Sequence, residues 1–311
     1  MTKSIGLAAF AALVFAAALL LPSWAIFSLT LAFARGMIVL GLMMLWRAGL
    51  VSFGHALYYA IGGYTIGMGP ILFGTSETVV LLCIAIVACL AVSLLLGALL
   101  ARYRHIFFAM LSLAFSMIMY GVLVKNSYLG STDGFNVAPL QLFGTVLQGS
   151  EGRVSLFVAA SVLSLLFALA VHRYLQSPIG RLDYAIRDNE VRVDYLGFSV
   201  YRVIYIKYVV SAILAGIGGA LTALAVGHVD PQMSYWTTSG EFVFVTILSG
   251  AGHVAAPFVG SVVFEIVRAF SLATVPHLWK AILGVCLLSV ILFLPGGLWS
   301  IVRRKNAGGR A

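Results

Sequence analysis

Residues 78–101 read TVVLLCIAIVACLAVSLLLGALLA, an apolar run without a charged residue. A helix needs about 20 such residues to cross the hydrocarbon core of a bilayer. The run does not alternate between polar and apolar positions, as the strands of a membrane β-barrel do. Similar uncharged runs recur at 106–124, 154–171, 208–227 and 281–302. Together they predict an all-α fold, a polytopic membrane helical bundle.

The composition of the whole chain agrees with that prediction. Of the 311 residues, 62% are hydrophobic and 9% are charged, whereas a soluble domain is about 45–50% apolar. The net charge is +9. The basic residues mostly flank apolar runs, however, which encodes membrane orientation and argues against nucleic acid as a partner. Cys83, Cys89 and Cys286 lie inside apolar runs without a CxxC spacing, so we expect buried packing and no metal site.

About ten transmembrane segments are predicted. If the N-terminus is inside, the inner connections carry most of the basic residues and the outer connections carry few, so both termini are predicted to be cytoplasmic. The first segment also fits a signal peptide with a cleavage site at Ser23-Trp24-Ala25, but an uncleaved span is the preferred interpretation. The predicted segments are 5–22, 25–46, 51–73, 78–101, 105–125, 154–173, 203–227, 240–251, 256–275 and 279–300.

Two segments are too rich in glycine to be simple spans. Residues 49–69 contain six glycines around His55, and residues 240–260 contain four glycines with Pro257 and His253. Interrupted segments in both halves of a transporter indicate broken or re-entrant helices beside a pathway. The alternative is that glycines only let helices pack closely. The candidate pathway residues in these two segments are Ser52, Gly54, His55, Gly62, Gly63, Gly250 and Gly252.

Ionisable residues inside predicted spans are the remaining candidates, since a charge within the membrane is costly. Arg35 lies midway along the second span. It is a candidate pathway residue that could attract a carboxylate, or it could pair with an acid on a neighbouring helix. Glu265 and Arg268 are three positions apart, so we expect them to neutralise each other on one helix face. For His55 and His253, hydrogen-bonded packing is favoured over a proton relay.

The longest charged stretch is SPIGRLDYAIRDNEVRVDYLG at 177–197. Ser177 can cap a helix and Pro178 fits its first position. Apolar residues then follow at spacings of three and four, which places a narrow apolar stripe on one face. Gly197 supplies a stop. We therefore predict a short amphipathic helix of about five turns at 3.6 residues each.

The charges of this helix discriminate between three roles. Asp183–Arg187 and Asp188–Arg192 are acid-before-base pairs four positions apart, which stabilise an exposed helix. A helix that lies on lipid would carry a mostly basic polar face, whereas this face mixes acids and bases. A helix that merely connects two spans and a helix that docks a soluble protein both fit, and the dock is favoured.

Several motifs resemble one family. The runs SPIGR, AIRDNE and LG, followed by AILAGIGGAL at 212–221, resemble the cytoplasmic coupling-helix region of ABC importer permeases, and in particular the branched-chain amino-acid (high-affinity leucine/isoleucine/valine) group. GLVSFGHALYYAIGGYT at 49–65 is similar to that group's glycine-rich signature. AMLSLAFSMIMYGVL with STDGFN, within 109–136, and FLPGGLWSIVRR at 293–304 also fit. The chain departs from the family at Asp183-Tyr184, Gly252-His253 and Arg35.

The resemblance implies a division of labour among subunits. Residues 1–311 would form a single permease domain of an importer in the bacterial cytoplasmic membrane. It would work with a sister permease subunit, two cytoplasmic ATP-binding subunits and an extracytoplasmic substrate-binding protein. The ATP-binding subunits would grip the 178–196 helix. The residues that the resemblance assigns to this coupling are Gly180, Arg181, Ala185, Arg187, Asp188, Glu190 and Gly197.

The chain lacks a G-x-x-x-x-G-K-[ST] phosphate loop, so ATP and Mg²⁺ would be bound by the partner subunits and this chain would not be an enzyme. The substrates implied are branched-chain or related amino acids. The alternatives are an ABC permease for urea or short amides and an ion-coupled secondary transporter. An intramembrane enzyme lacks a convincing catalytic set of residues.

Overall fold

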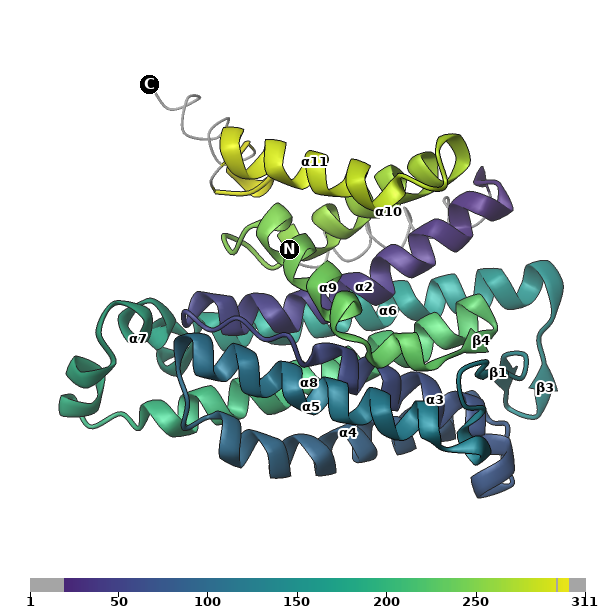
Figure 1. Ribbon diagram of the computed structural model, residues 1–311, viewed down its shortest axis with the longest axis horizontal. Helices are drawn as coiled ribbons and strands as arrows, with labels where there is room; N and C mark the ends of the chain where they lie inside the picture. Colours follow the sequence, from purple (N-terminus) through teal and green to yellow (C-terminus); the bar gives the residue numbers. More distant parts are fainter. Residues whose placement is uncertain (1–19, 295, 302–311) are drawn as a thin grey trace, which may run out of the picture.

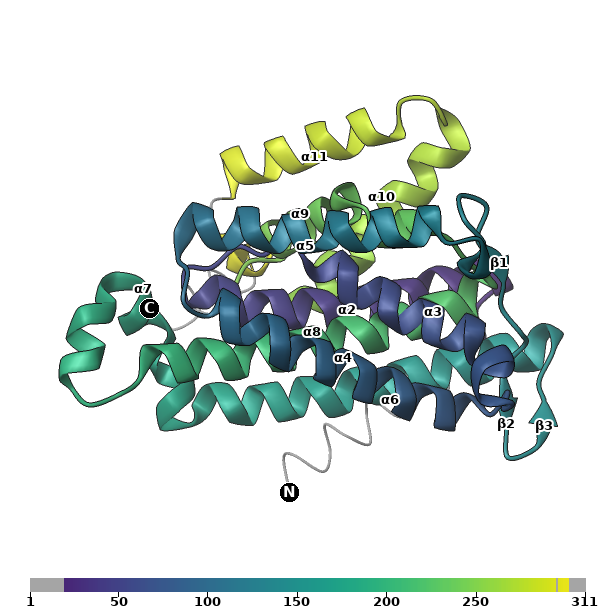
Figure 2. The same ribbon diagram turned by 60° about the horizontal axis from the view of Figure 1, so that its bottom comes forward.

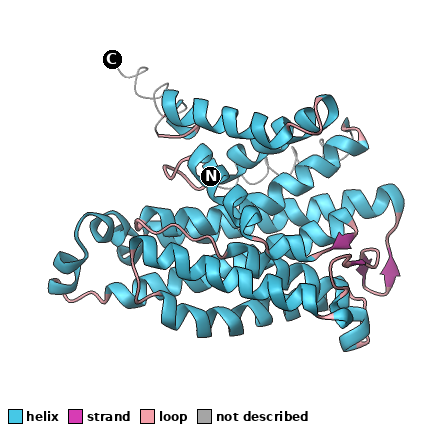
Figure 3. Cartoon of the chain, in the orientation of Figure 1, coloured by secondary structure: helices cyan, strands magenta, loops and turns pink. Residues whose placement is uncertain are grey.

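The structure is a computed structural model, described over residues 20–294 and 296–301. Helices make up nearly all of it, as Figure 3 shows. The predicted first span at 5–22, and with it the choice between a span and a signal peptide, lies almost wholly outside the described residues. Within them, the prediction of an all-α polytopic bundle is confirmed.

The helices follow one another with short connections, and the few strands are two residues long. The strands pair antiparallel, β1 with β4 and β2 with β3. The elements are α2 (Ser23–Arg47), α3 (His55–Phe73), α4 (Thr78–Leu100), α5 (His105–Lys125), η1 (Ser127–Leu129), β1 (Phe135–Asn136), β2 (Gln141–Leu142), β3 (Thr145–Val146), α6 (Gly149–Gln176), α7 (Pro178–Tyr195), α8 (Val200–Val226), β4 (His228–Val229), η2 (Pro231–Ser234), α9 (Trp236–Ser249), α10 (Ala256–Thr274) and α11 (Trp279–Phe293).

Seven of the described helices are long and apolar enough to cross a membrane, namely α2, α3, α4, α5, α6, α8 and α10. The predicted segment at 240–251 corresponds to α9, which has 14 residues. At 1.5 Å per residue it spans about 21 Å, short of the roughly 30 Å of hydrocarbon. Helix α11, predicted at 279–300, has 15 residues. The count of ten spans therefore stays a prediction.

The long helices run roughly along one direction, as Figures 1 and 2 show. Helix α7 lies at one end of the bundle, here called the α7 end. The short strands lie at the opposite end, here called the strand end. In Figure 1, α11 lies at the top, and α10 lies between it and α2, against which α10 packs. The α7 end and the strand end are the two faces that a membrane would separate.

Helix α8 lies at the centre and packs against α2, α3 and α4. Small residues permit this, because a Cβ on Gly62 of α3 would collide with the backbone of Gly216, and one on Gly219 would collide with the backbone of Tyr59. Close approach through small residues is the usual way in which membrane helices associate. The glycines of α3 thus serve helix packing, the alternative raised above.

The peripheral helices turn apolar side chains outward. Val87 and Leu95 of α4 and Phe107 and Ile118 of α5 are all exposed, as expected of helix faces in contact with lipid. Of the cysteines predicted to be packed inside, Cys89 is buried against α3, whereas Cys83 is exposed and Cys286 is half-buried.

Candidate functional site

Helix α7 begins and ends as its sequence predicts. Ser177 precedes it, and its Oγ accepts a hydrogen bond from the backbone N–H of Gly180 at 3.2 Å. Pro178 occupies the first position, where its missing N–H costs no hydrogen bond. After the helix, Gly197 takes a φ of +86°, which glycine adopts without steric cost.

The prediction of one unbroken helix is wrong at Asn189. Its φ of −161° and ψ of 97° lie outside the helical region, so α7 is two short helices, 178–188 and 190–195, joined by a kink. The Asn189 Oδ1 accepts a hydrogen bond from the backbone N–H of Arg192 at 3.0 Å. It therefore caps the second helix, because asparagine competes with a helical backbone for its own hydrogen bonds.

A buried ion cluster holds α7 against the bundle. The Asp183 carboxylate contacts the Lys207 ammonium of α8, and both side chains are fully buried. The Arg47 Nε of α2 lies 3.5 Å from the second Asp183 oxygen, and an Arg47 Nη donates to the carbonyl of Ala251 at 3.3 Å. We call Arg47, Asp183 and Lys207 the anchor cluster.

The anchor cluster corrects a sequence prediction. Asp183 was expected to pair with Arg187 on an exposed face, but among the described residues its ionic partners are Lys207 and Arg47. The position borders the apolar stripe of α7, beside buried Ile186. The carboxylate therefore faces α2 and α8 and not the solvent.

The rest of α7 divides into a packed side and an exposed side. Gly180 is buried against the backbone of Tyr174, where a Cβ would collide. Glu190 is half-exposed, and its carboxylate accepts a hydrogen bond from Arg104 Nε at 2.6 Å, so this acid already has a partner within the chain. The coupling candidates on the exposed side are Arg181, Ala185, Arg187, Asp188 and Gly197.

A groove of about 550 Å³ runs between α7 and the connections that lead into α3 and α5. Residues 48–51 form one wall, Arg104 and His105 another, and the kinked part of α7, residues 186–191, the third. Arg187 packs on Gly49 there. The groove lies at the α7 end, beside the exposed charges of α7.

Two non-helical segments enter the bundle and meet on α5. Residues 48–54 precede α3, and the N–H of Phe53 donates to the Ser112 Oγ of α5 at 3.1 Å. One turn further along α5, the Ser116 Oγ donates to the carbonyl of Ser234 at 2.7 Å, just before α9. The prediction of interrupted segments in both halves agrees with the backbone, because residues 48–54 are non-helical before α3 and residues 250–255 separate α9 from α10.

His55 is a packed residue in the centre of this region. It is fully buried, with Nδ1 2.9 Å from the Ser52 Oγ and Nε2 3.0 Å from the Ser211 Oγ of α8. Gly54 lies against the backbone of Ser112, and Gly63 against the side chain of Met233. These pathway candidates form close contacts between α3, α5, α8 and η2.

Gly250 and Gly252 lie elsewhere, in the connection between α9 and α10 at the α7 end. A Cβ on Gly250 would collide with the backbone of Gly296, and its φ is +81°. His253 stacks on Trp299 with ring centroids 4.9 Å apart. Burial and the nearby His172 lower the pKa of His253. The two glycines therefore join α9 to the C-terminal segment.

The largest cavity described has a volume of about 700 Å³. Its walls come from the half of α2 nearest the strand end, Tyr59 of α3, the last turns of α8, η2, α9, α10 and the start of α11. Along α2 the lining residues stop at Ile38. Beyond it Met43, Met44 and Leu45 are buried and do not line the cavity.

Arg35 lies in this cavity and pairs with acids of two other helices. Its Nη1 lies 3.3 Å from the Glu241 carboxylate of α9 and its Nη2 2.9 Å from that of Glu265 of α10. Its guanidinium also lies over the Phe264 ring, 4.3 Å from the centroid. Arg268 approaches Glu265 at 3.7 Å, as the sequence predicts. We call Arg35, Glu241, Glu265 and Arg268 the cavity cluster.

Of the predicted pathway residues, Arg35 lines the cavity, whereas Ser52, Gly54 and His55 lie in the packed centre. Sequence reasoning missed Glu241 and Lys207. Both are ionisable residues within predicted spans, the signal that singled out Arg35.

Comparison with known proteins agrees with this architecture. The family model described as "Branched-chain amino acid transport system / permease component" matches residues 24–291, most of the chain. The chain belongs to this permease family. It is therefore a multi-pass membrane protein of a transport family, as its motifs predict. No solved structure matches the chain.

Curated relatives of this permease share about a quarter of its residues. It is 25% identical over 295 residues to the high-affinity branched-chain amino acid transport system permease protein LivM of Salmonella typhimurium, covering 86% of this chain and 68% of that protein. It is 24% identical over 285 residues to the corresponding LivH of Escherichia coli K12, covering 86% and 92%. The ribose import permease protein RbsC of Haemophilus influenzae is 22% identical over 229 residues, covering 69% and 70%.

Proposed function

We propose that this permease is one membrane-spanning subunit of an ATP-driven ABC importer for branched-chain or related amino acids. A binding protein delivers the substrate at the strand end, and two ATP-binding subunits dock on α7 at the opposite end. Alternating access of the membrane cavity is coupled to ATP through this helix. The observation that carries the proposal is α7 itself, a charged helix outside the spans that is anchored in the core of the bundle.

The two sides of α7 support a coupling role. Its exposed side presents Arg181, Arg187 and Asp188, which suit a polar protein interface. Its buried side carries Asp183 into the anchor cluster with α2 and α8. A push on α7 therefore acts on two long spans and on the connection at Ala251, which Arg47 contacts. Four further residues shape this helix and are also proposed to take part in coupling, namely Gly180, Ala185, Glu190 and Gly197.

The cavity at the strand end supports an outward-facing state. It is lined by parts of six α-helices, and its lining along α2 ends at Ile38. A sister permease, itself a subunit of the same fold, would complete the pathway. ATP and Mg²⁺ are assigned to the partner subunits, and this chain acts as a transport subunit.

The proposed function also implies a topology of the chain in the membrane. Residues 1–311 form one permease domain with ten spans, both termini cytoplasmic, and α7 on the cytoplasmic side of the bacterial inner membrane. Glu77 accepts a hydrogen bond from Gly144 between β2 and β3, and Asp133 and Asp230 adjoin β1 and β4, whereas Arg47 and Arg104 contact acids of α7. That distribution agrees with the positive-inside rule.

Reconstitution into proteoliposomes tests this function. The complete complex of permease, sister permease, ATP-binding subunits and binding protein is expected to accumulate leucine only with internal ATP. Omitting the ATP-binding subunits is expected to abolish uptake. Uptake by the purified permease alone, driven by an ion gradient, would show a secondary transporter, an alternative that the family match does not favour.

A further inference from the structure

We propose that the cavity cluster, together with Lys280, binds the charged head group of a zwitterionic amino acid within the membrane. The inference rests on the proposed importer function and adds a substrate site within this chain. Glu241 would receive the α-ammonium, and Arg268 with Lys280 would receive the α-carboxylate. The apolar wall of the cavity would take the side chain.

The charges that line the cavity are balanced. Its cations are Arg35, Arg268 and Lys280, and its carboxylates are Asp230, Glu241 and Glu265. A net-neutral solute with two opposite charges keeps that balance. A solute with one net charge would leave a desolvated charge without a partner, which is costly. The cavity therefore favours a zwitterion over a simple anion or cation.

The internal ion pairs leave capacity for a ligand. Arg35 is 9% exposed and lines the cavity, yet its Nε has no hydrogen-bond partner. Arg268 Nε is likewise without a partner, and its Nη1 reaches Glu265 only at 3.7 Å, beyond hydrogen-bond distance. Within the described residues, Lys280 makes no salt bridge. Lys280 is exposed, but the buried Nε atoms of Arg35 and Arg268 indicate a partner that the chain does not supply.

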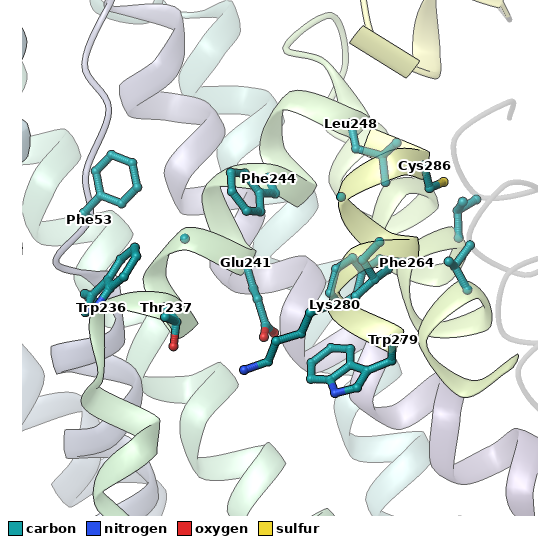
Figure 4. Close-up of a pocket in the computed structure, with 15 residues that line it drawn as sticks. Phe53, Trp236, Thr237, Glu241, Phe244, Leu248, Phe264, Trp279, Lys280 and Cys286 are labelled. Carbon is teal, nitrogen blue, oxygen red and sulfur yellow. The ribbon is translucent and has the colours of Figure 1, made fainter. Parts of the chain in front are cut away.

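The two poles of the site lie on different helices. Glu241 of α9 is held by Arg35 but keeps about a quarter of its side chain exposed (27%). On α10 and α11, the guanidinium of Arg268 and the ammonium of Lys280 lie 5.7 and 5.5 Å from the centre of the Trp279 ring. Figure 4 is a close-up of an adjoining pocket of about 250 Å³, which shares Glu241, Trp279 and Lys280 with the cavity, and shows Lys280 between Glu241 and Trp279.

The remaining walls suit an aliphatic side chain. The volume of about 700 Å³ lies within the range of small-molecule pockets, about 300–1,000 Å³. Apolar side chains that line the cavity are Phe27, Leu31, Ile38, Met233, Phe242 and Leu272. A few charged groups that fix orientation beside an apolar wall are typical of such sites.

Equilibrium binding to the permease complex in nanodiscs, without the binding protein, tests the inference. Three ligands of equal shape separate the poles: leucine with both charges, leucinamide with only the ammonium, and 4-methylpentanoate with only the carboxylate. The wild-type complex is expected to bind leucine most tightly. Glu241→Gln is expected to weaken leucine and leucinamide by about tenfold, since a hydrogen bond to a charged group is lost, and to spare 4-methylpentanoate.

The cationic pole is tested by the double variant Arg268→Gln with Lys280→Gln, for which we expect the opposite pattern: leucine and 4-methylpentanoate weaken and leucinamide is spared. Glu241→Asp keeps the charge and is expected to retain leucine binding. Glu151→Gln and Arg153→Gln, exposed residues outside this cavity, are the controls. If Glu241→Gln fails to assemble, the cationic variant decides.

No leucine binding to the wild type, or equal weakening of all three ligands in each variant, would overturn the inference. Either result is distinct from failure of the importer function. The wild-type complex would then still take up leucine with ATP and binding protein, whereas failure of the function removes that uptake before any variant is made.

Discussion

The anchor cluster and the cavity cluster are both built on a buried arginine of α2, yet they differ in the exposure of their other members: Asp183 and Lys207 are fully buried, whereas Glu241 and Arg268 are 27% and 33% exposed. Arg47 at the α7 end approaches the carboxylate of a fully buried Asp183–Lys207 pair. Arg35, twelve positions earlier and about 18 Å away along the helix, pairs with acids at the wall of a cavity. The anchor cluster can only hold helices together, whereas the cavity cluster can exchange its partners for a ligand.

Fully buried ion pairs hold helices together, whereas ion pairs at a cavity wall are available to bind a ligand. A desolvated pair resists separation, because each separated ion would remain in a medium of low dielectric constant. The partly exposed contacts of Glu241 and Arg268 lose less when they open. Since α2 carries an arginine of each cluster, one continuous helix joins the proposed docking end to the proposed substrate site.

The largest effect on stability is expected from breaking the buried Asp183–Lys207 pair. Asp183→Ala leaves Lys207 buried without its partner, which costs about 3–5 kcal/mol of stability. Thermal unfolding in detergent measures it, with Asp188→Ala on the exposed side of α7 as the matched control. Asp183→Leu combined with Lys207→Met is expected to restore most of that loss. An unchanged unfolding temperature for Asp183→Ala would mean that the pair does not form.

A smaller effect on stability is expected from breaking the ion pairs of the cavity cluster. Arg35→Gln leaves Glu241 and Glu265 without their shared cation, but cavity water and Arg268 compensate in part. The expected loss is about 1–3 kcal/mol. The same unfolding measurement applies, with the exposed Arg153→Gln as control. A loss as large as that of Asp183→Ala would remove the distinction between the two clusters.

The smallest effect on stability is expected at the surface of α7. Glu190→Ala breaks a half-exposed pair with Arg104, and such pairs contribute at most about 1 kcal/mol. Transport is expected to respond more than stability, with less leucine moved per ATP hydrolysed, because α7 loses its tie to the connection before α5. Arg187→Ala is expected to uncouple in the same way.

The readout is the ratio of leucine uptake to ATP hydrolysis in proteoliposomes. Glu151→Ala, an exposed acid at the strand end, is the control. A normal ratio in both α7 variants would count against α7 as the coupling element.

Much of the fold is predictable because lipid imposes long apolar runs. The runs place α4 and α5 within one residue of their ends. Apolar runs do not predict the structure of a segment that contacts protein instead of lipid. The N–H groups of Phe53 and Ala56, around the start of α3, donate to the hydroxyls of Ser112 and Ser239, and the carbonyl of Ser234, before α9, accepts from Ser116. No local pattern encodes those contacts.

The same limit applies to the candidate site. Capping by Ser177 and the stop at Gly197 are local and could be predicted, whereas the kink at Asn189 competes with an otherwise helical pattern. The partner of Arg35 on α9 lies 206 positions away. A single sequence predicts that a charge in a span needs a partner, but only packing selects Glu241 and Glu265.

Site-specific photo-cross-linking tests the central claim, that α7 docks the ATP-binding subunits, most directly. Tyr195 on α7 is 88% exposed and Phe143, beside β2 at the strand end, is 92% exposed. Replacing each in turn by benzoylphenylalanine in the complete complex gives a matched pair of probes. The account predicts that position 195 cross-links to an ATP-binding subunit and position 143 does not. Cross-linking of the ATP-binding subunit from position 143, and none from 195, would contradict it.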